Sequence, residues 1–308
     1  MEYADPWGTG DRISVVGFGG WPIGGHGYGP VEDSRSVAAV RKALDIGITL
    51  FDTADVYGFG HSEEILAKAL GPRIRDVVLA TKFGVRWDGS GRTWKDCSPG
   101  YLKAALDASL KRLKTDCVPL YQLHWHDGVT PLSDVFEAMF RLREEGKVRN
   151  IGCSNIPNSV FRDTIKSGKI DSAQLQYSLS YQDSSRDLLA YRGQDKMATL
   201  VYGVLARGLL SGKYGKNSIF GEGDTRGEDP NFRETMDRNS LIVHGLRKVS
   251  AKYRKTPGQV AIRWVLENPS VSCALVGVKS EEQVLENAGA VGWFLEKEDR
   301  DYLGSLGI

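Results

Sequence analysis

The stretch ISVVGFGGWPIGG, residues 13–25, distinguishes between the two common kinds of α/β fold. An apolar run leads directly into glycines, as it does at the first strand–helix turn of a doubly wound nucleotide-binding sheet. That turn needs the spacing G-x-G-x-x-G, but Pro22 stands where the third glycine would follow Gly17 and Gly19. The stretch GLLSGKY at 208–214 also misses the spacing of a phosphate-binding loop by one residue. Both departures favour the other common α/β fold, a closed barrel.

Strand-like and helix-like segments alternate along the chain eight times. A helix is expected to begin at Ser98 and Pro99, and another at Pro131 with its end at Gly146. This alternation with short connections indicates a parallel sheet covered by helices. We therefore predict a (β/α)8 TIM barrel that forms a single domain over residues 1–308. The candidate strands are 13–18, 48–52, 76–82, 118–125, 148–153, 171–175, 198–202 and 272–277.

Charge, hydropathy and cysteine usage narrow the class of function. The chain has 40 Lys and Arg against 39 Asp and Glu, so no global field favours nucleic acid or an anionic membrane. It shows no secretory leader and no apolar stretch of about 18 residues that could span a bilayer. Four scattered cysteines without C-x-x-C spacing fit reduced thiols. We expect a soluble, cytoplasmic protein that acts on a small molecule, and the sequence leaves its oligomeric state open.

A barrel places its active site at the carboxyl ends of the strands, so polar residues there are candidates. Four of them fit the reduction of a carbonyl group, in which negative charge develops on oxygen. Tyr57 can donate a proton, and a neighbouring Lys82 ammonium would lower the pKa of its hydroxyl. Asp52 would keep a buried Lys82 charged, and His124 would be the polar neighbour of the carbonyl oxygen.

Seven motifs, in order along nearly the whole chain, resemble those of the aldo-keto reductases. The resemblance is to a bacterial-type member of the branch that includes potassium-channel β subunits. It implies a (β/α)8 barrel, an extended nicotinamide cofactor bound without a Rossmann domain, and Tyr57 as proton donor. It also implies that Asp52 and Lys82 tune Tyr57 and that His124 orients the carbonyl. The motifs are FDTADVYG (51–58), ATKFG (80–84), LYQLHW (120–125), GCSN (152–155), QYSLSY (176–181), RGLLSGKY (207–214) and GVKSEEQVLENAGA (277–290).

The remaining strand ends are then expected to bind the cofactor. Ser154, Asn155 and Gln174 offer groups that suit a nicotinamide carboxamide, and Tyr202 offers a flat face for its ring. The resemblance places residues 203–213 along the pyrophosphate. The predicted cofactor-binding residues are Gly20, Trp21, Asp52, Ser154, Asn155, Gln174, Tyr202, Gly203, Val204, Leu205, Ala206, Arg207, Lys213, Arg226, Gly277, Lys279, Ser280, Gln283, Glu286 and Asn287, with Arg226 part of a clasp.

The start of the helix that follows the last predicted strand, 272–277, indicates which nicotinamide cofactor is used. Free backbone N–H groups and the helix dipole favour a phosphate there. The pair Lys279 and Ser280 suggests a 2′-phosphate, so NADP(H) is the expected cofactor. Many aldo-keto reductases have an arginine where this chain has Gln283, which removes a bidentate contact. NADP(H) is therefore preferred, and use of NAD(H) stays open.

Two alternative functions follow from the same residues. His124 and His126 would face one side of a strand that continued through residue 126 and could bind a divalent metal, as in a barrel hydrolase. The turn signal at Asp127 and Gly128 and the poor ligands at other strand ends argue against that, so no metal is predicted. The resemblance to channel β subunits leaves a cofactor-bound regulatory subunit as the second alternative.

Substrate specificity is expected to lie in the loops above the strand ends. The stretches 84–98 and 214–238 are long and polar, and the first of them contains Trp87. Tryptophans near a site suit a sugar or another polyhydroxy carbonyl compound, and simple aldehydes stay open. Presence of His124 favours carbonyl and alcohol chemistry over reduction of a C=C bond. The candidate substrate contacts are Trp21, Trp87, Trp125 and His126.

Overall fold

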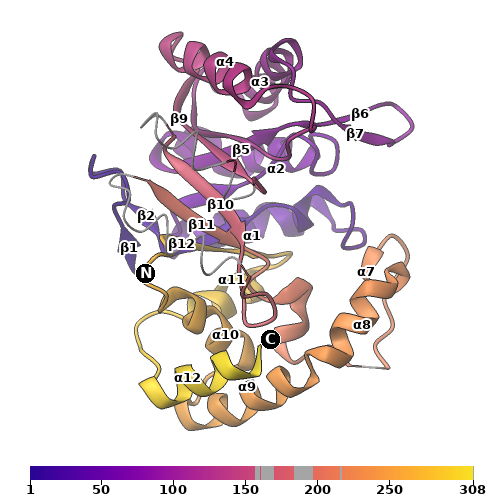
Figure 1. Cartoon of the computed structure of the whole chain (residues 1–308), viewed down its shortest axis with the longest axis vertical. Helices are drawn as coiled ribbons and strands as arrows, with labels where there is room; N and C mark the ends of the chain where they lie inside the picture. The colour runs from indigo at the N-terminus through magenta and orange to yellow at the C-terminus, as the bar shows by residue number, and fades with distance from the viewer. Residues whose placement is uncertain (157–159, 161–169, 184–196, 216, 308) are drawn as a thin grey trace.

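The structure, a computed structural model, describes residues 1–156, 160, 170–183, 197–215 and 217–307 (Figure 1). Its centre is a closed barrel of eight parallel strands, each of which pairs with the next barrel strand along the chain. The predicted (β/α)8 barrel is confirmed, and all eight predicted strand segments contribute to it. The barrel strands are β3 (Val16–Gly19), β4 (Leu50–Asp52), β5 (Val78–Phe83), β8 (Val118–Leu123), β9 (Val148–Ser154), β10 (Ser172–Gln176), β11 (Ala198–Tyr202) and β12 (Cys273–Gly277).

Helices surround the barrel, and their ends follow the sequence signals. Ser98 caps the helix that begins at Pro99, since its hydroxyl accepts a hydrogen bond from the backbone N–H of Tyr101, at 3.4 Å. The helix expected at Pro131 begins one residue later. The longer helices are α1 (Asp33–Asp45), α2 (His61–Leu70), α3 (Pro99–Leu113), α4 (Leu132–Glu144), α8 (Pro230–Arg238), α9 (Ser240–Tyr253), α10 (Pro257–Leu266), α11 (Glu281–Ala288) and α12 (Lys297–Leu306).

The apolar residues form two buried layers. The larger lies between the strands and the surrounding helices, and it includes Cys153. The smaller fills the barrel, because alternate side chains of each strand point inward. Its members are Trp7, Ile13, Leu50, Val78, Ala80, Leu120, Ala198, Leu200, Cys273 and Leu275. All four cysteines lie within the described residues and are free thiols.

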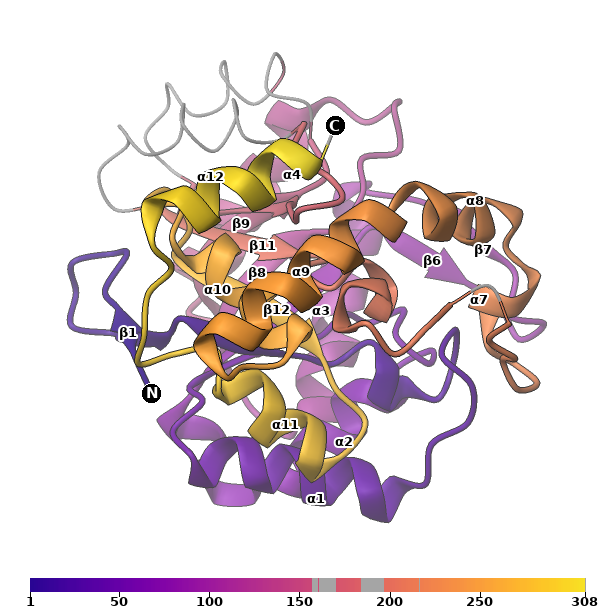
Figure 2. The same cartoon turned by 90° about the horizontal axis from the view of Figure 1, so that it is seen from below.

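The structure differs from the predicted strands at two places. The segment 13–18 is divided, because β2 (Ile13–Ser14) pairs antiparallel with β1 (Tyr3–Ala4), and only β3 joins the barrel. The stretch 84–98, expected as a loop, contains an antiparallel hairpin of β6 (Val85–Trp87) and β7 (Thr93–Lys95). This hairpin extends on the side of the barrel away from β1 (Figures 1 and 2).

The part of the chain around residues 214–238 folds as short helices rather than as a plain loop. Here α7 (Thr225–Glu228) precedes α8, and both lie on the same side of the barrel as the β6–β7 hairpin (Figures 1 and 2). Residue 216 falls outside the described residues. Throughout the described chain, helices long and apolar enough to cross a bilayer are absent.

Candidate active site

Two charged residues occupy the inward positions at the carboxyl ends of β4 and β5. Asp52 follows Leu50 by two residues and Lys82 follows Ala80 by two, so strand alternation points both toward the barrel interior. Lys82 is fully buried, and its ammonium donates to Asp52 Oδ1 at 2.6 Å and to the carbonyl of Thr53 at 2.7 Å. A buried ion pair therefore lies inside the barrel at the carboxyl ends of β4 and β5.

Two neighbouring residues supply aromatic rings next to this ion pair. Lys82 Nζ lies 5.1 Å from the centre of the Tyr57 ring, and the His124 ring meets the Tyr57 ring edge-on at 5.6 Å between centres. Tyr57 lies in the turn after β4, and His124 is the first residue after β8. The structure thus brings together all four residues that the sequence proposed for carbonyl chemistry.

Burial sets the charge of two of these groups. It lowers the pKa of Lys82, although the Asp52 carboxylate opposes that effect. It also holds the pKa of His124 well below its usual range, and the positive charge of Lys82 lowers it further. The His124 imidazole is therefore neutral near pH 7 and can donate a hydrogen bond from one ring nitrogen. Its buried Nδ1 has no hydrogen-bond partner.

The pKa of Tyr57 shifts in the direction opposite to the one expected from Lys82. Burial raises it well above its usual value, and the negative charge of Asp52 raises it further. The Lys82 ammonium donates to Asp52 and to the carbonyl of Thr53. Tyr57 consequently carries its proton near neutral pH, which is the form that a proton donor needs.

Asp52 also joins residues that were predicted to bind the cofactor. Gln174 of β10 is buried, and its amide nitrogen donates to Asp52 Oδ2 at 2.9 Å. The backbone N–H of Gly20 donates to the carbonyl of Asp52 at 2.7 Å. Trp21 lies nearly parallel to Tyr57, with 5.9 Å between the ring centres. These contacts place three predicted cofactor residues directly around the four-residue cluster.

A second group of predicted cofactor residues lies at the ends of β9 and β11. Tyr202 donates its hydroxyl hydrogen to the side-chain oxygen of Asn155 at 2.6 Å. The Asn155 amide in turn donates to Ser154 Oγ at 3.0 Å and to the carbonyl of His124 at 3.1 Å. Burial raises the pKa of Tyr202 to about 12, so its hydroxyl stays protonated. The ring of Tyr202 is therefore fixed beside the residue that follows β8.

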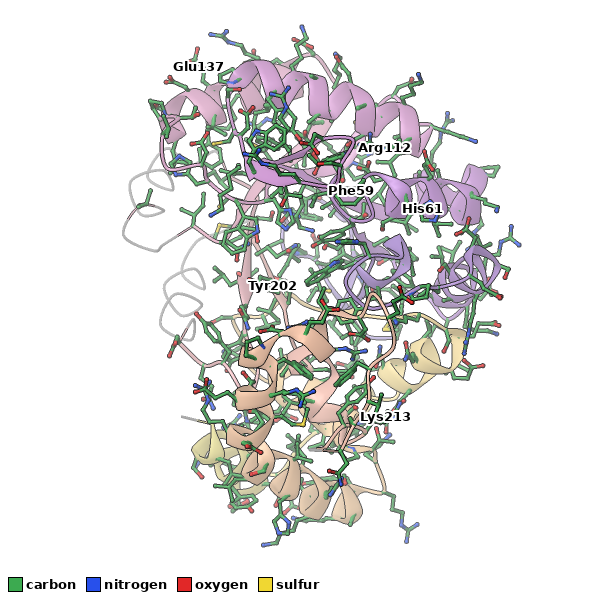
Figure 3. The ribbon with its side chains drawn as sticks, turned by 90° about the vertical axis from the view of Figure 1, so that its right-hand side faces the viewer. Phe59, His61, Arg112, Glu137, Tyr202 and Lys213 are labelled. Atoms are coloured by element: carbon green, nitrogen blue, oxygen red, sulfur yellow. The ribbon has the colours of Figure 1, made fainter. Side chains whose placement is uncertain are left out.

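The segment after β11 carries the predicted pyrophosphate contacts. Gly203 and Val204 lead into a short helix at Ala206–Ser211, in which Arg207 has a positive φ of 56°. Arg207 Nη1 donates to Asp229 at 2.6 Å. In Figure 3, Tyr202 lies near the middle of the molecule and Lys213 farther toward the last helices. Lys213 forms an ion pair with Glu286 of α11 at 2.9 Å.

Residues 223–226 form a clasp with the loop 25–29 that follows β3. Gly29 N–H donates to the carbonyl of Gly223 at 3.2 Å, and Thr225 donates its hydroxyl hydrogen to the carbonyl of Gly27 at 2.9 Å. Arg226 is buried there, with two nitrogens bonded to Asp224 at 2.9 and 2.6 Å. These contacts join Arg226 to the loop after β3, and its predicted role over the cofactor stays a prediction.

The start of α11 holds the residues predicted near a 2′-phosphate. Ser280 caps the helix, and the side-chain oxygen of Gln283 accepts from the backbone N–H of Lys279 at 2.7 Å. Lys279 Nζ donates to the carbonyl of Tyr28, which joins the last strand end to the clasp loop. Gly277 ends β12, and Asn287 is buried in α11.

Positive charge gathers beside Lys279, and part of it was missed from the sequence. Burial lowers the pKa of Lys279, and the charges of Arg226 and Arg35 lower it further, against the effect of Asp224. Arg35 lies in α1, which packs against α11. Tyr28 was missed as well. Nothing in a local motif signals either residue, because both reach this region through the packing of distant segments.

The candidate substrate residues lie around the cluster but not as a metal pair. β8 ends at Leu123, so His126 does not share a strand face with His124. The His126 ring nitrogen Nε2 lies 2.7 Å from the carbonyl of Thr130. The potential metal ligands that do approach one another, Cys97, His126 and Asp127, leave out His124. The geometry thus lacks the His124–His126 pair that a barrel hydrolase would need.

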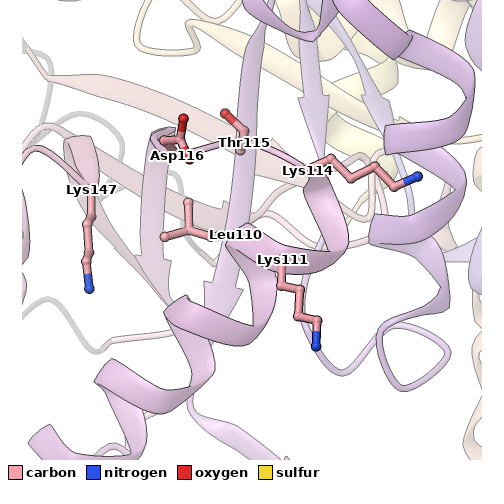
Figure 4. A pocket seen from close by; sticks show the side chains of 6 residues that line it. All are labelled: Leu110, Lys111, Lys114, Thr115, Asp116 and Lys147. Carbon is pink, nitrogen blue, oxygen red and sulfur yellow. The ribbon is translucent and has the colours of Figure 1, made fainter.

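A surface hollow at the opposite end of the barrel has a different character. It lies between the end of α3 and the starts of β8 and β9, and none of the four clustered residues lines it (Figure 4). Half of its lining residues are lysines, and it is open to solvent. The lining residues are Leu110, Lys111, Lys114, Thr115, Asp116 and Lys147.

The fold and the cluster define a class of barrel oxidoreductase, and sequence comparison agrees. Residues 15–307 match the profile of the Aldo/keto reductase family, so the chain belongs to that family of nicotinamide-dependent oxidoreductases. It is 36% identical to the aldo-keto reductase YhdN of Bacillus subtilis over 99% of this chain and 93% of that protein. The glycerol dehydrogenase AKR11B4 from Gluconobacter oxydans superposes with a TM-score of 0.89 at 31% identity, covering 99% of this chain and 94% of that one.

Relatives differ in the cofactor that their descriptions state. A Klebsiella pneumoniae aldo/keto reductase was solved with NADP and acetate; it has a TM-score of 0.78 at 26% identity, covering 99% of this chain and 95% of that one. The NADH-specific methylglyoxal reductase of Escherichia coli is 30% identical over 96% of this chain and 95% of that protein. Membership of the family therefore establishes a nicotinamide cofactor but not which of the two.

Proposed function

We propose that the protein is a carbonyl reductase that interconverts an aldehyde, ketone or sugar carbonyl with the corresponding alcohol. The observation that carries this proposal is the convergence of Tyr57, Lys82 and His124 at one end of the barrel, with Asp52 beneath them. A bound nicotinamide cofactor would supply the hydride. The protein's own part is to hold the carbonyl and to provide a proton.

Each side chain has a distinct task in this proposal. Neutral His124 donates a hydrogen bond to the carbonyl oxygen, and that bond strengthens as negative charge develops there. Tyr57, which keeps its proton near neutral pH, gives that proton to the same oxygen. Asp52 and Lys82 form an ion pair next to the Tyr57 ring, so their opposite charges balance. Because the pKa of Tyr57 is raised, its hydroxyl is protonated at neutral pH, and the strongly basic nascent alkoxide can take that proton.

Replacing Tyr57 by Phe tests this role. The ring contacts remain while the proton donor is lost, so we expect kcat to fall by about 10²–10⁴-fold. Cofactor affinity, measured by fluorescence titration, should change less than about twofold. Tyr3→Phe is the matched control, because Tyr3 lies at the other end of the barrel and its hydroxyl donates to the carbonyl of Gly47.

Two outcomes would argue against the proposed function. A Tyr57→Phe protein with unchanged kcat would remove Tyr57 from the reaction. A native protein that binds NADPH but turns over no member of a broad panel of aldehydes, ketones and sugars, in either direction, would instead support a cofactor-binding regulatory subunit.

We further propose NADP(H) as the preferred cofactor. The support is the positive charge of Lys279, Arg35 and Arg226 near the start of α11, where Ser280 begins the helix. Arg35 would supply charge that Gln283 does not. The ratio of kcat/KM values for NADPH and NADH measures this preference directly, and a ratio at or below one would contradict it.

A further inference from the structure

The β6–β7 hairpin presents two different faces. Its register pairs Val85 with Lys95, Arg86 with Trp94, and Trp87 with Thr93. Paired residues and residues two apart share a face of such a hairpin. Val85, Trp87, Thr93 and Lys95 therefore lie on one face, and Arg86 and Trp94 lie on the other.

The face that carries Lys95 borders the candidate active site on two sides. The Trp87 ring packs against Phe59, with 6.1 Å between centres, and Phe59 follows Tyr57 by two residues. Lys95 Nζ lies 4.9 Å from the centre of the Trp125 ring, and Trp125 directly follows His124. The hairpin thus contacts the segments that carry the proposed proton donor and the proposed carbonyl ligand.

Lys95 differs from the cation on the other face in its charge balance. Arg86 Nη1 pairs with Asp96 at 3.2 Å, whereas Lys95 has no carboxylate within 4.0 Å among the residues that the structure describes. Trp125 is partly exposed, so its ring holds the ammonium above it while leaving the ammonium open to solvent.

The nearby carboxylates are occupied by other donors. Asp127 accepts hydrogen bonds from the backbone N–H groups of Cys97, Val129 and Thr130 and from the hydroxyl of Thr130. These bonds hold the pKa of Asp127 well below its usual range, against the effect of burial. Asp96 accepts from Ser98 as well as from Arg86. Lys95 therefore carries a positive charge that no described carboxylate binds, while Asp127 keeps a negative charge that only neutral donors bind.

The inner cluster adds no net charge of its own. The Lys82 ammonium is matched by the Asp52 carboxylate, and both His124 and Tyr57 are neutral near pH 7. A substrate whose carbonyl reaches His124 and whose far end reaches Trp125 would meet the Lys95 ammonium beside the Trp125 ring. An anionic group on that far end would gain a charge-assisted hydrogen bond, and a hydroxyl group would gain much less.

We propose that Lys95 makes the enzyme prefer carbonyl substrates that carry a carboxylate or phosphate group remote from the carbonyl. This specificity rests on the carbonyl-reductase function proposed above. Trp87 and Trp125 cover the apolar middle of such a substrate, and the Lys95 ammonium binds its anionic oxygens. The cation is the specificity-determining group, and the two tryptophans position it and the substrate.

Matched pairs of aldehydes test this preference. One arm compares 4-oxobutanoate with butanal, and the other compares glyceraldehyde 3-phosphate with glyceraldehyde. In the native protein we expect a higher kcat/KM for the anionic member of at least one pair, and the pair that responds identifies the group. Lys95→Met should reduce that preference about tenfold, and Lys95→Glu should reverse it. Added salt should weaken the native preference.

Two controls separate the charge from the fold. Lys95→Arg should keep the preference, and Lys114→Met, at the other end of the barrel, should not alter it. The neutral aldehydes should keep their kcat/KM within about twofold in every variant. If Lys95→Met leaves the ratio of kcat/KM for anionic and neutral substrates unchanged, the inference is overturned. The proposed function would still stand in that case if Tyr57→Phe lowers kcat as expected. A native protein that reduces neither pair would overturn both this inference and the proposed function.

Discussion

Lys82 and Lys95 each contact an aromatic ring at almost the same distance, but one lysine is buried and the other is exposed. Lys82, at the end of β5, lies 5.1 Å from the Tyr57 ring centre, is fully buried and pairs with Asp52. Lys95, at the end of β7, lies 4.9 Å from the Trp125 ring centre, is exposed and has no paired carboxylate among the described residues. The buried lysine is paired with a carboxylate beside the groups proposed to react, whereas the exposed lysine is left free to bind a ligand.

The sharpest test of this contrast removes the buried cation. Lys82→Met would leave Asp52 buried without its ion-pair partner, and breaking a buried pair costs about 3–5 kcal/mol. We expect the free energy of unfolding, measured in urea, to fall by that amount. The double variant Asp52→Asn with Lys82→Met should lose less stability than the single variant, because no buried charge remains. A loss below about 1 kcal/mol in Lys82→Met would show that the pair is not buried as described.

Asp55 is a buried acid that has no ion-pair partner among the described residues, whereas Lys95 is an exposed cation without one. The buried Asp55 carboxyl group predicts a pH effect. Burial raises the pKa of Asp55 well above its usual value, and the charge of Glu63 raises it further. The folded protein therefore binds the proton more tightly than the unfolded chain does. Stability falls as pH rises from about 4, the unfolded value, to the raised folded value.

The side chain of Asp55→Asn is neutral at every pH, so this variant should not lose stability as the pH rises. At pH 7 we expect the variant to be more stable than the native protein, by about 1.4 kcal/mol for each pH unit by which folding raises the pKa. The difference should disappear below about pH 4, where both proteins carry a neutral side chain. Urea unfolding at pH 4 and pH 7 measures this. Equal destabilisation at both pH values would mean that the carboxyl group has a packing role only.

Arg35 is a second exposed cation that we expect to serve a ligand. Arg35→Ala should raise the dissociation constant for NADPH by about three- to tenfold, since it removes one charged contact near the 2′-phosphate. The constant for NADH should stay within about twofold. Arg41→Ala, an exposed position on the same helix, is the control. A loss of affinity that is equal for both cofactors would remove Arg35 from phosphate recognition.

The smallest expected effect is that of Lys95→Met on the stability of the protein. Lys95→Met should change the free energy of unfolding by less than about 1 kcal/mol, because a cation over a ring at an exposed site contributes little. Thermal unfolding of the two proteins measures it. A much larger loss would show that Lys95 holds the hairpin in place, and the comparison with Lys82 would then fail.

The barrel was predictable because it depends on local periodicity, and the central cluster because its residues follow strand ends and lie in motifs that resemble a known family. Each strand appears as a short apolar run, and strand alternation alone points Asp52 and Lys82 inward. The β6–β7 hairpin was missed, although VRW and TWK flank the turn-forming stretch DGSGR. That signal is weak, since a two-stranded hairpin depends on packing against neighbours such as Phe59.

Contacts between distant segments could not be read from the sequence. Arg35 and Tyr28 come close to Lys279 only because α1 packs on α11 and the clasp loop folds across the end of the barrel. The pKa of Tyr57 depends on how deeply the ring is buried and on which group binds Lys82. Neither quantity has a sequence pattern, so the net rise in the pKa of Tyr57 could not be read from the sequence.

Gly84 joins the barrel to the hairpin and has a consequence for protein engineering. Its φ of 108° suits glycine, and a Cβ atom there would lie 2.8 Å from the carbonyl oxygen of Trp125. This residue is the whole connection between β5 and β6. A side chain at residue 84 would therefore push β6 away from the segment that carries Trp125, and hairpin variants made to test the proposed substrate preference should keep Gly84.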